Sequence, residues 1–149
     1  SVTSRPWVIL CAEDDPDDRL LMRDAIADVA FVDELVFVED GEEVLDYLRR
    51  EGAFADSDHR TPQIVVLDLN MPRKDGREAL REIKSDPRLR AIPVVILTTS
   101  SAPADIDGSY DSGASSFITK PQSYRDLVAV VYALRRYWRD TVELPSAVA

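Results

Sequence analysis

Residues 64–72 read IVVLDLNMP, a run of four apolar residues followed by an aspartate, an asparagine and a proline. Four more apolar runs of strand length occur along the chain, at Trp7–Ala12, Leu35–Val38, Val94–Leu97 and Phe117–Thr119. These runs are continuous rather than alternating and rich in Val and Ile, which is typical of strands that helices cover on both faces. The five runs therefore predict a five-stranded parallel sheet.

The segments between the strands carry apolar residues at helical spacing. The residues with this spacing are Leu21, Ala25 and Val29; Val44, Leu45 and Leu48; Ala79, Leu80 and Ile83; and Leu127, Val130, Val131 and Leu134, with a weaker helix expected at Ala104 to Ser112. Asp75-Gly76 is expected to open the third helix, Gly113 to cap the fourth and Ser123 to cap the fifth. Strands alternating with helices indicate a doubly wound α/β fold with right-handed crossovers.

The length and the charge narrow the class of protein. A chain of 149 residues is about one domain, and we expect the domain to span residues 1–138, with a C-terminal tail at 139–149 and no separate output domain. The net charge of −10 argues against nucleic acid and anionic membrane partners. No apolar run is long enough to span a membrane and no signal peptide is evident, so we expect a cytoplasmic location.

One cysteine and one histidine exclude a disulfide framework, a Cys-based zinc site and a His-rich metal site within the chain. Cys11 lies inside an apolar strand and is expected to be a small core residue rather than a reactive thiol. His59 lies in the polar connection 51–62, and we expect it to be solvated.

Polar residues follow four of the five predicted strands. In an open parallel sheet, functional groups gather beyond the carboxyl ends of the strands. The first strand is followed by an acidic run at 13–18, the third by Asp68, the fourth ends in hydroxyls that begin at Thr98, and the fifth ends at Lys120. Crowded carboxylates need a cation, and Mg²⁺ suits oxygen ligands. Such a set fits phosphoryl transfer, in which the carboxylate itself can accept the phosphoryl group as an acyl phosphate.

The whole set resembles the receiver domain of two-component response regulators. The matching residues are Glu13-Asp14, Asp68-Leu69-Asn70-Met71-Pro72 with Asp75-Gly76, Thr98 thirty residues beyond Asp68, and Lys120-Pro121. The resemblance covers nearly the whole chain and implies a flavodoxin-like sheet in the order 2-1-3-4-5.

The resemblance implies a role for each matching residue. Asp68 is the phosphoacceptor, and it holds Mg²⁺ with Asp14 and the backbone carbonyl of Asn70, while Glu13 acts directly or through water. Asp14-Asp15 is the alternative acidic pair; we favour Glu13-Asp14 because the family's pair directly follows the strand. Asp17 and Asp18 are interpreted as first-turn residues of a helix, where acids suit the helix dipole.

The remaining roles concern the phosphoryl group and the switch. Thr98, the amide at Thr99 and Lys120 are expected to bind phosphoryl oxygens. Phe117 is expected to turn in behind Thr98, which shifts the surface around the fourth and fifth helices. A phosphoacceptor of this kind is a signalling protein rather than an enzyme, since it takes part only in its own phosphorylation and dephosphorylation.

Within the family, the chain resembles stand-alone receivers partnered with bacterial phytochromes. The segments that carry this likeness are DDPDD at 14–18, LDLNMPRKDG at 67–76, ILTTS at 96–100, TKP at 119–121 and the aromatic pair Tyr137-Trp138. The likeness implies a sensor histidine kinase partner, with a bacterial phytochrome as the candidate, and a homodimer through the face of the fourth and fifth helices.

Two other functions are compatible with parts of this pattern. A haloacid-dehalogenase-type phosphatase also uses an Asp acceptor and Mg²⁺, but it needs a general acid two residues further on, where this chain has Asn70. A pseudo-receiver would be a binding module with an idle site, which the intact set of Asp14, Asp68, Thr98 and Lys120 disfavours.

Overall fold

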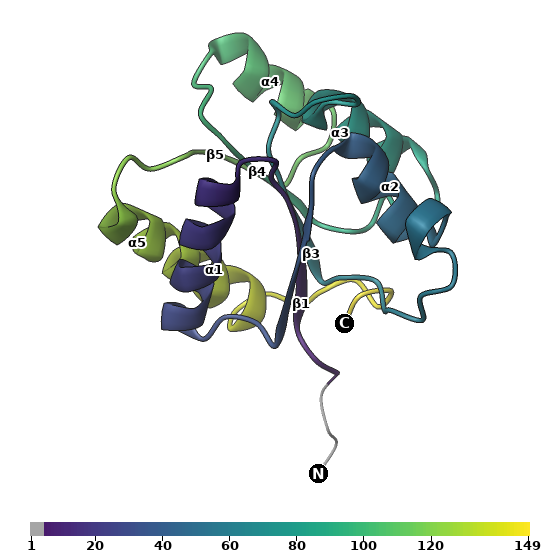
Figure 1. Ribbon diagram of the computed structural model, residues 1–149, viewed down its shortest axis with the longest axis horizontal. Helices are drawn as coiled ribbons and strands as arrows, with labels where there is room; N and C mark the ends of the chain where they lie inside the picture. Colours follow the sequence, from purple (N-terminus) through teal and green to yellow (C-terminus); the bar gives the residue numbers. More distant parts are fainter. Residues whose placement is uncertain (1–4) are drawn as a thin grey trace.

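A five-stranded parallel sheet forms the centre of the protein (Figure 1). The computed structural model describes residues 5–149. The strands are β1 (Val8–Ala12), β2 (Glu34–Val38), β3 (Ile64–Leu67), β4 (Val94–Thr98) and β5 (Ser116–Thr119). They pair in the order β2-β1-β3-β4-β5. The predicted parallel sheet and its strand order are therefore confirmed, with strand ends that differ by one residue or so from the sequence runs.

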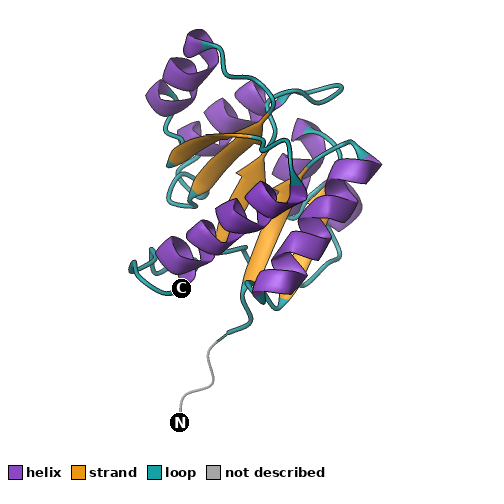
Figure 2. Cartoon of the chain, turned by 90° about the vertical axis from the view of Figure 1, so that its left-hand side faces the viewer, coloured by secondary structure: helices purple, strands orange, loops and turns teal. Residues whose placement is uncertain are grey.

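Helices cover both faces of this sheet. α1 (Pro16–Val29) and α5 (Tyr124–Leu134) lie side by side on one face, and α2 (Gly41–Arg49), α3 (Gly76–Ser85) and α4 (Pro103–Asp111) lie on the other (Figures 1 and 2). None of the described helices combines the length and the apolar character that crossing a membrane requires.

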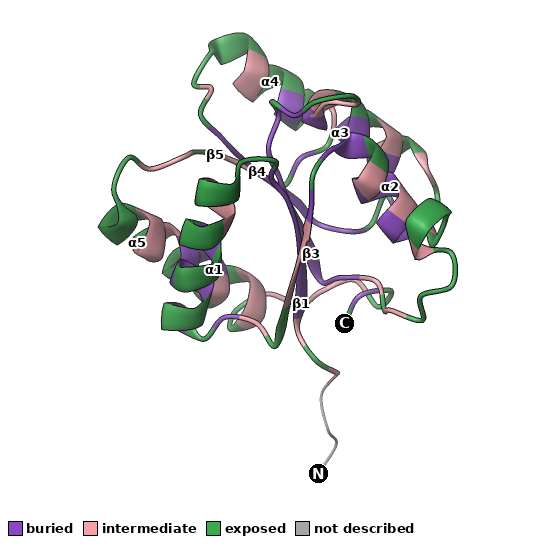
Figure 3. Ribbon diagram, viewed as in Figure 1, coloured by how far each residue is buried: buried purple, intermediate pink, exposed green. Residues whose placement is uncertain are grey.

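Each central strand contributes to two separate cores. In β1, Leu10 and Ala12 pack on the α2 and α3 side, whereas Ile9 and Cys11 pack on the α1 and α5 side. All five residues of β1 are buried (Figure 3). Side chains alternate across a strand, so a strand covered on both faces must be apolar at every position. Cys11 is 3% exposed, as expected of a core residue.

The helix starts follow the polar residues that the sequence offers. Asp15, Asp40, Asp75 and Ser123 each accept a hydrogen bond from a backbone N–H in the first turn of the helix that follows. Such caps satisfy N–H groups that have no partner within the helix. The predicted openings at Asp75-Gly76 and at Ser123 are thus confirmed. α4 has no side-chain cap and begins with a proline.

Two segments pack more closely than the sequence suggested. The ring of His59 is not freely solvated, because it stacks on Tyr47 at a centroid distance of 3.8 Å, and its Nε2 lies 2.7 Å from the carbonyl oxygen of Tyr47. At the other end, a π-helical turn, Arg135–Arg139, extends α5. The following segment returns to the domain, where Val148 is fully buried in the core on the α2 and α3 side and Leu144 packs against that core. The residues after α5 therefore contribute to the same compact unit.

Candidate functional site

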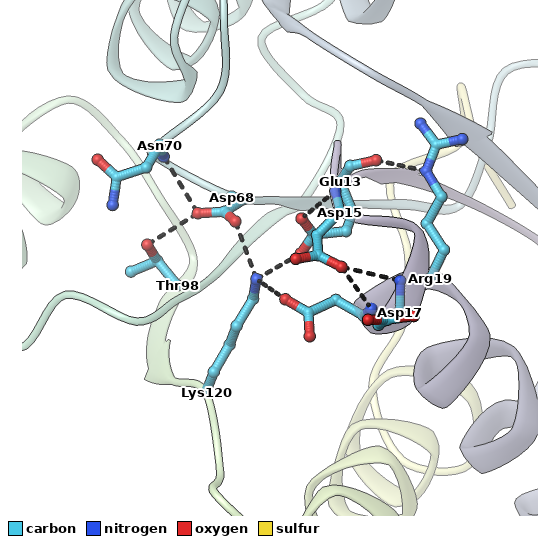
Figure 4. Close-up of polar contacts among 9 residues, drawn as sticks. Glu13, Asp15, Asp17, Arg19, Asp68, Asn70, Thr98 and Lys120 are labelled. Carbon is cyan, nitrogen blue, oxygen red and sulfur yellow. Dashed lines mark hydrogen bonds and ion pairs between the residues drawn. The ribbon is translucent and has the colours of Figure 1, made fainter.

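The polar residues that follow β1, β3, β4 and β5 converge at one edge of the sheet (Figure 4). The parallel register brings this about, because Ala12 pairs with Leu67, Leu67 with Ile96, and Thr98 with Thr119. Each strand therefore ends at nearly the same level. The residue directly after β1 is Glu13, the residue directly after β3 is Asp68, and the residue directly after β5 is Lys120.

Asp68 lies at the centre of the site and is 6% exposed. Its Oδ1 accepts hydrogen bonds from Thr98 Oγ1 at 2.9 Å and from the backbone N–H of Asn70 at 3.1 Å. Its Oδ2 accepts one from Lys120 Nζ at 2.9 Å. Both oxygens of a buried carboxylate thus have hydrogen-bond partners, which fixes the orientation of the side chain.

Gly76 brings the start of α3 close to the backbone of Asp68. A Cβ atom at Gly76 would lie 2.0 Å from the carbonyl oxygen of Asp68 and 2.8 Å from Leu69 Cα. Both are backbone atoms, so they cannot rotate away. The Gly76 N–H also donates to the Leu69 carbonyl at 3.0 Å. The residue after Asp75 must therefore be glycine for the loop that carries Asn70 to lie where it does.

Lys120 joins three carboxylates. Its Nζ donates to Glu13 Oε1, to Asp68 Oδ2 at 2.9 Å and to Asp18 Oδ2 at 3.0 Å. Burial by itself lowers the pKa of this ammonium, but the hydrogen bonds to Glu13, Asp68 and Asp18 outweigh burial and raise the pKa above its ordinary value. Lys120 is therefore a permanent positive charge beside Asp68.

The acidic residues at this edge form a group that suits a hard cation. One carboxylate oxygen each from Glu13, Asp14 and Asp68 lies within 4.8 Å of the others. Burial raises the pKa of Glu13, and this effect exceeds the opposing effect of Lys120. The donor set consists of oxygens with excess negative charge, and Mg²⁺ prefers such ligands. The residues present therefore fit the expected magnesium ion.

The structure separates the two acidic pairs that the sequence left open. Asp15 is the N-cap of α1, and its Oδ1 accepts from the backbone N–H of Asp17 at 2.8 Å and of Asp18 at 3.2 Å. Its carboxylate is thus committed to the helix, and among the described residues it does not belong to the carboxylate group around Asp68. This arrangement favours Glu13-Asp14 as the pair.

Asp18 corrects one expectation. The sequence predicts only a first-turn role for it, but its carboxylate contacts Lys120, 102 residues away in the sequence. The N-cap at Asp15 places Asp18 three residues into the helix start, where its side chain reaches the edge of the sheet. The cap pattern predicts where Asp18 lies in the helix, but its contact with Lys120 depends on how α1 packs against α5, the helix that follows Lys120.

The other expected site residues lie at different depths. Thr98 is fully buried, whereas Thr99, the next residue, is exposed. Phe117 is half-buried on β5 against the core of the α2 and α3 side. Its backbone N–H donates to the Tyr110 hydroxyl of α4 at 3.1 Å. Phe117 therefore links β5 to α4 through a side chain that sequence reasoning did not single out.

Two ion pairs around the site were also missed. Arg73 donates to the buried carboxylate of Asp40 at 2.5 Å, which ties the loop after β3 to the start of α2. Arg77 pairs with Asp105 at 2.9 Å, and Asp105 also accepts from Ser100 Oγ at 2.6 Å. The hydrogen bonds from Ser100 and Arg77 lower the pKa of Asp105. These contacts hold the loops after β3 and β4 in place.

Comparison with known proteins agrees with this geometry. Residues 9–132 match the family described as response regulator receiver domain. The chain belongs to the response regulator receiver family. This receiver is 38% identical to the response regulator Rcp1 of Synechocystis sp. over 142 residues, which cover 95% of each chain.

Solved structures of relatives have the same fold. The phosphorylated cyanobacterial phytochrome response regulator RcpA is 43% identical to this receiver, with a TM-score of 0.86 and coverage of 94% of this chain and 99% of that chain. An Mn²⁺-bound form of Rcp1 superposes with a TM-score of 0.86 at 38% identity, covering 95% of this chain and 100% of that chain. This receiver is therefore homologous to response regulators of phytochrome signalling.

Proposed function

We propose that Asp68 of this receiver accepts a phosphoryl group from a histidine of a sensor kinase, in a Mg²⁺-dependent reaction. The observation that carries this proposal is the position of Asp68: a buried carboxylate at the end of β3, in contact with Thr98, the Asn70 amide and Lys120. In the transfer, one carboxylate oxygen forms a bond to phosphorus. The bond from phosphorus to the histidine nitrogen breaks, and the electron pair of that bond stays on the nitrogen.

The residues around Asp68 have separate tasks in this transfer. Glu13, Asp14, Asp68 and the carbonyl oxygen of Asn70 would hold Mg²⁺, which neutralises charge on the phosphoryl oxygens. Lys120 offers an ammonium to one phosphoryl oxygen. Thr98 offers its hydroxyl, and Thr99 its amide, to the others. No proton transfer to a leaving group is needed from Asp68 itself.

The phosphorylated state would be transmitted through Thr98 and Phe117. Because Thr98 Oγ1 donates to Asp68 Oδ1, a phosphoryl group on Asp68 changes the partner of this hydroxyl. Movement of the loop after β4 would change the space behind Phe117, whose N–H is bound by Tyr110 of α4. The surface of α4, β5 and α5 is thereby coupled to a new dianion at Asp68.

The same surface would also form a homodimer. An apolar groove lies between β5 and α5, lined mainly by Ile118, Val130, Ala133, Leu134, Tyr137 and Trp138. Tyr132 and Tyr137 are more than half exposed. Exposed aromatic residues beside an apolar groove suit an interface between proteins. Sedimentation of the wild type and of Tyr137→Glu tests this, with a dimer expected only for the wild type.

The names of the relatives support a proposal for the kinase partner. RcpA is described as a cyanobacterial phytochrome response regulator, and Rcp1 is a response regulator of similar length. We infer that a phytochrome-type sensor kinase in the cytoplasm phosphorylates this receiver. The cognate kinase would transfer phosphate to the receiver faster than other kinases from the same cell.

Phosphorylation of Asp68 can be tested directly. Incubation with a small phosphodonor and Mg²⁺ should add a single base-labile phosphate, detected by mass spectrometry of the intact protein. Asp68→Asn should stay unmodified, whereas Asp56→Asn, a change in the exposed polar connection, should be modified as the wild type is. An inert wild type would refute the proposal and favour a pseudo-receiver.

A phosphatase is the second candidate, and the site disfavours it. Asn70 presents its backbone N–H to Asp68, and its side chain is an amide, which is far too weak an acid to protonate a leaving group. Multiple turnovers on varied phosphate esters would instead support the phosphatase.

A further inference from the structure

Lys120 has one carboxylate partner that lies outside the expected cation site. Its three partners among residues 5–149 are Glu13, Asp68 and Asp18. Glu13 and Asp68 belong to the group of carboxylates that suits a cation, and Asp18 does not. A lysine ammonium has three N–H donors, so each carboxylate occupies one of them. A cation and Lys120 would therefore share two acceptors, and only Asp18 remains for Lys120 alone.

The surroundings of Lys120 offer few other acceptors on the α1 side. A small pocket lies between β1, α1 and α5, and Lys120, Glu13 and Asp18 are the charged residues that line it. The rest of its lining is mainly apolar: Cys11, Ala12, Leu21, Met22, Val66, Leu97, Pro121 and Leu127. An ammonium released from Asp18 would meet an apolar wall on this side, so it would turn back to Glu13 and Asp68.

We propose that Asp18 is a positioning residue, which holds Lys120 beside Asp68 while Glu13 and Asp68 share a bound cation. This proposal rests on the proposed function. The backbone of Asp18 is itself fixed, because its N–H donates to the Asp15 cap at 3.2 Å. Its carboxylate is 39% exposed, so water screens the pair and its effect on binding is moderate.

The adjacent acid provides a matched control. Asp17 carries the same charge, lies in the same first turn of α1 and is exposed. It is not among the three carboxylate partners of Lys120 within residues 5–149. Asp17→Asn and Asp18→Asn therefore remove the same charge from neighbouring positions, and only the second removes a contact with Lys120.

The first measurement is Mg²⁺ affinity. It is obtained from the change in backbone amide chemical shifts as the unphosphorylated protein is titrated with magnesium. Without Asp18 the Lys120 ammonium has only Glu13 and Asp68 as carboxylate partners, so it competes with the cation for these two side chains. We expect Asp18→Asn to weaken Mg²⁺ binding about two- to fivefold more than Asp17→Asn does. In a Lys120→Met background this difference should vanish. Equal effects in the first background, or a difference that persists in the second, would overturn the proposal.

The second measurement follows Lys120 itself and needs no phosphoryl transfer. The chain has three lysines, so the ¹H–¹⁵N spectrum of its lysine ammonium groups is simple, and Lys120→Arg assigns the signal. Hydrogen bonds slow exchange of these protons with water. With Mg²⁺ present, the Lys120 protons should exchange as slowly in Asp17→Asn and in Asp18→Glu as in the wild type. They should exchange faster in Asp18→Asn, which lacks the one acceptor that the ammonium does not share with the cation. Exchange as slow in Asp18→Asn as in the wild type would refute the role of Asp18.

These results also separate this inference from the proposed function. If the wild type binds Mg²⁺ but a phosphodonor leaves Asp68 unmodified, the proposed function fails. The Mg²⁺ affinities and the Lys120 proton exchange of the variants still decide the role of Asp18. If Asp68 is phosphorylated and Asp18→Asn behaves as Asp17→Asn, only the role of Asp18 fails.

Discussion

Substitution of Gly76 by alanine should affect both stability and phosphorylation, because of its contact with the backbone of Asp68. The new Cβ would start 2.0 Å from the carbonyl oxygen of Asp68, whereas ordinary contact begins near 3.4 Å. The difference, 3.4 − 2.0 = 1.4 Å, must be taken up by α3 or by the loop that carries Asp68 and Asn70. Both are backbone segments, so the strain cannot be relieved by a rotamer change.

The size of the effect follows from two opposing contributions. Overpacking of this kind costs about 1–3 kcal/mol, and a clash with backbone belongs at the upper end. Alanine in place of glycine in a helix returns at most about 1 kcal/mol. We expect a net loss of about 2 kcal/mol in the free energy of unfolding, which is about 4–8 °C in Tm for a chain of this size. A displacement near 1 Å at Asp68 should also slow phosphorylation by about 100-fold.

Gly108 provides the matched control. It lies within α4, and a Cβ there would meet nothing within 4 Å. Gly108→Ala should therefore stabilise the receiver by about 0.5–1 kcal/mol and leave the phosphorylation rate unchanged. Urea unfolding followed by circular dichroism gives the first quantity, and mass spectrometry of the phosphorylated chain gives the second. A Gly76→Ala variant as stable and as reactive as the wild type would contradict the steric argument.

Four further results are expected. Burial raises the pKa of Cys11 to about 12, so at pH 8 only about one thiol in ten thousand is ionised. A thiol reagent should therefore label the native receiver very slowly and the urea-unfolded chain rapidly. Fast labelling of the native receiver would show that β1 is accessible to solvent. Because this pKa lies above the ordinary value of 9.0, stability due to the neutral thiol is present below pH 9 and is lost as the pH rises towards 12; Cys11→Ala should weaken this pH dependence in urea unfolding. Val148→Ala should cost about 2 kcal/mol by urea unfolding, since two buried methyl groups are removed from a fully buried site, and a cost near zero would mean that the segment after α5 does not pack in solution. If Mg²⁺ binds with a Kd of about 1 mM, then 10 mM Mg²⁺ should stabilise the receiver by about 1.4 kcal/mol, or about 3–6 °C in Tm. Asp14→Ala should abolish this increase in Tm. An unchanged increase in the variant would exclude Asp14 as a ligand.

The central elements of the fold were predictable from local pattern. The runs at Ile64–Leu67 and Val94–Leu97 are apolar at every position because helices cover both faces of the sheet. Once the strands are parallel, the residues that follow them must meet at one edge, so the sequence alone predicts that Asp68 and Lys120 lie together. The strand order itself came from the family resemblance, not from the pattern.

The contacts around the site were less predictable. The acidic run predicts only a helix-dipole role for Asp18, and no periodicity in the sequence connects it to Lys120. The pair of Arg73 and Asp40 joins residues 33 positions apart, through a loop residue with a φ of 58°. The packing of one element on another decides which partner such a side chain meets, and composition carries no information on that packing.

By itself, then, the sequence determined which residues form the parallel strands and which polar groups follow them, because burial on two faces and the direction of a parallel strand are local properties. The tertiary structure decided which carboxylates share the ammonium of Lys120, that His59 stacks on Tyr47, and that Val148 returns to the core. These depend on distances between segments far apart in the chain, and such distances are set only when the helices pack on the sheet.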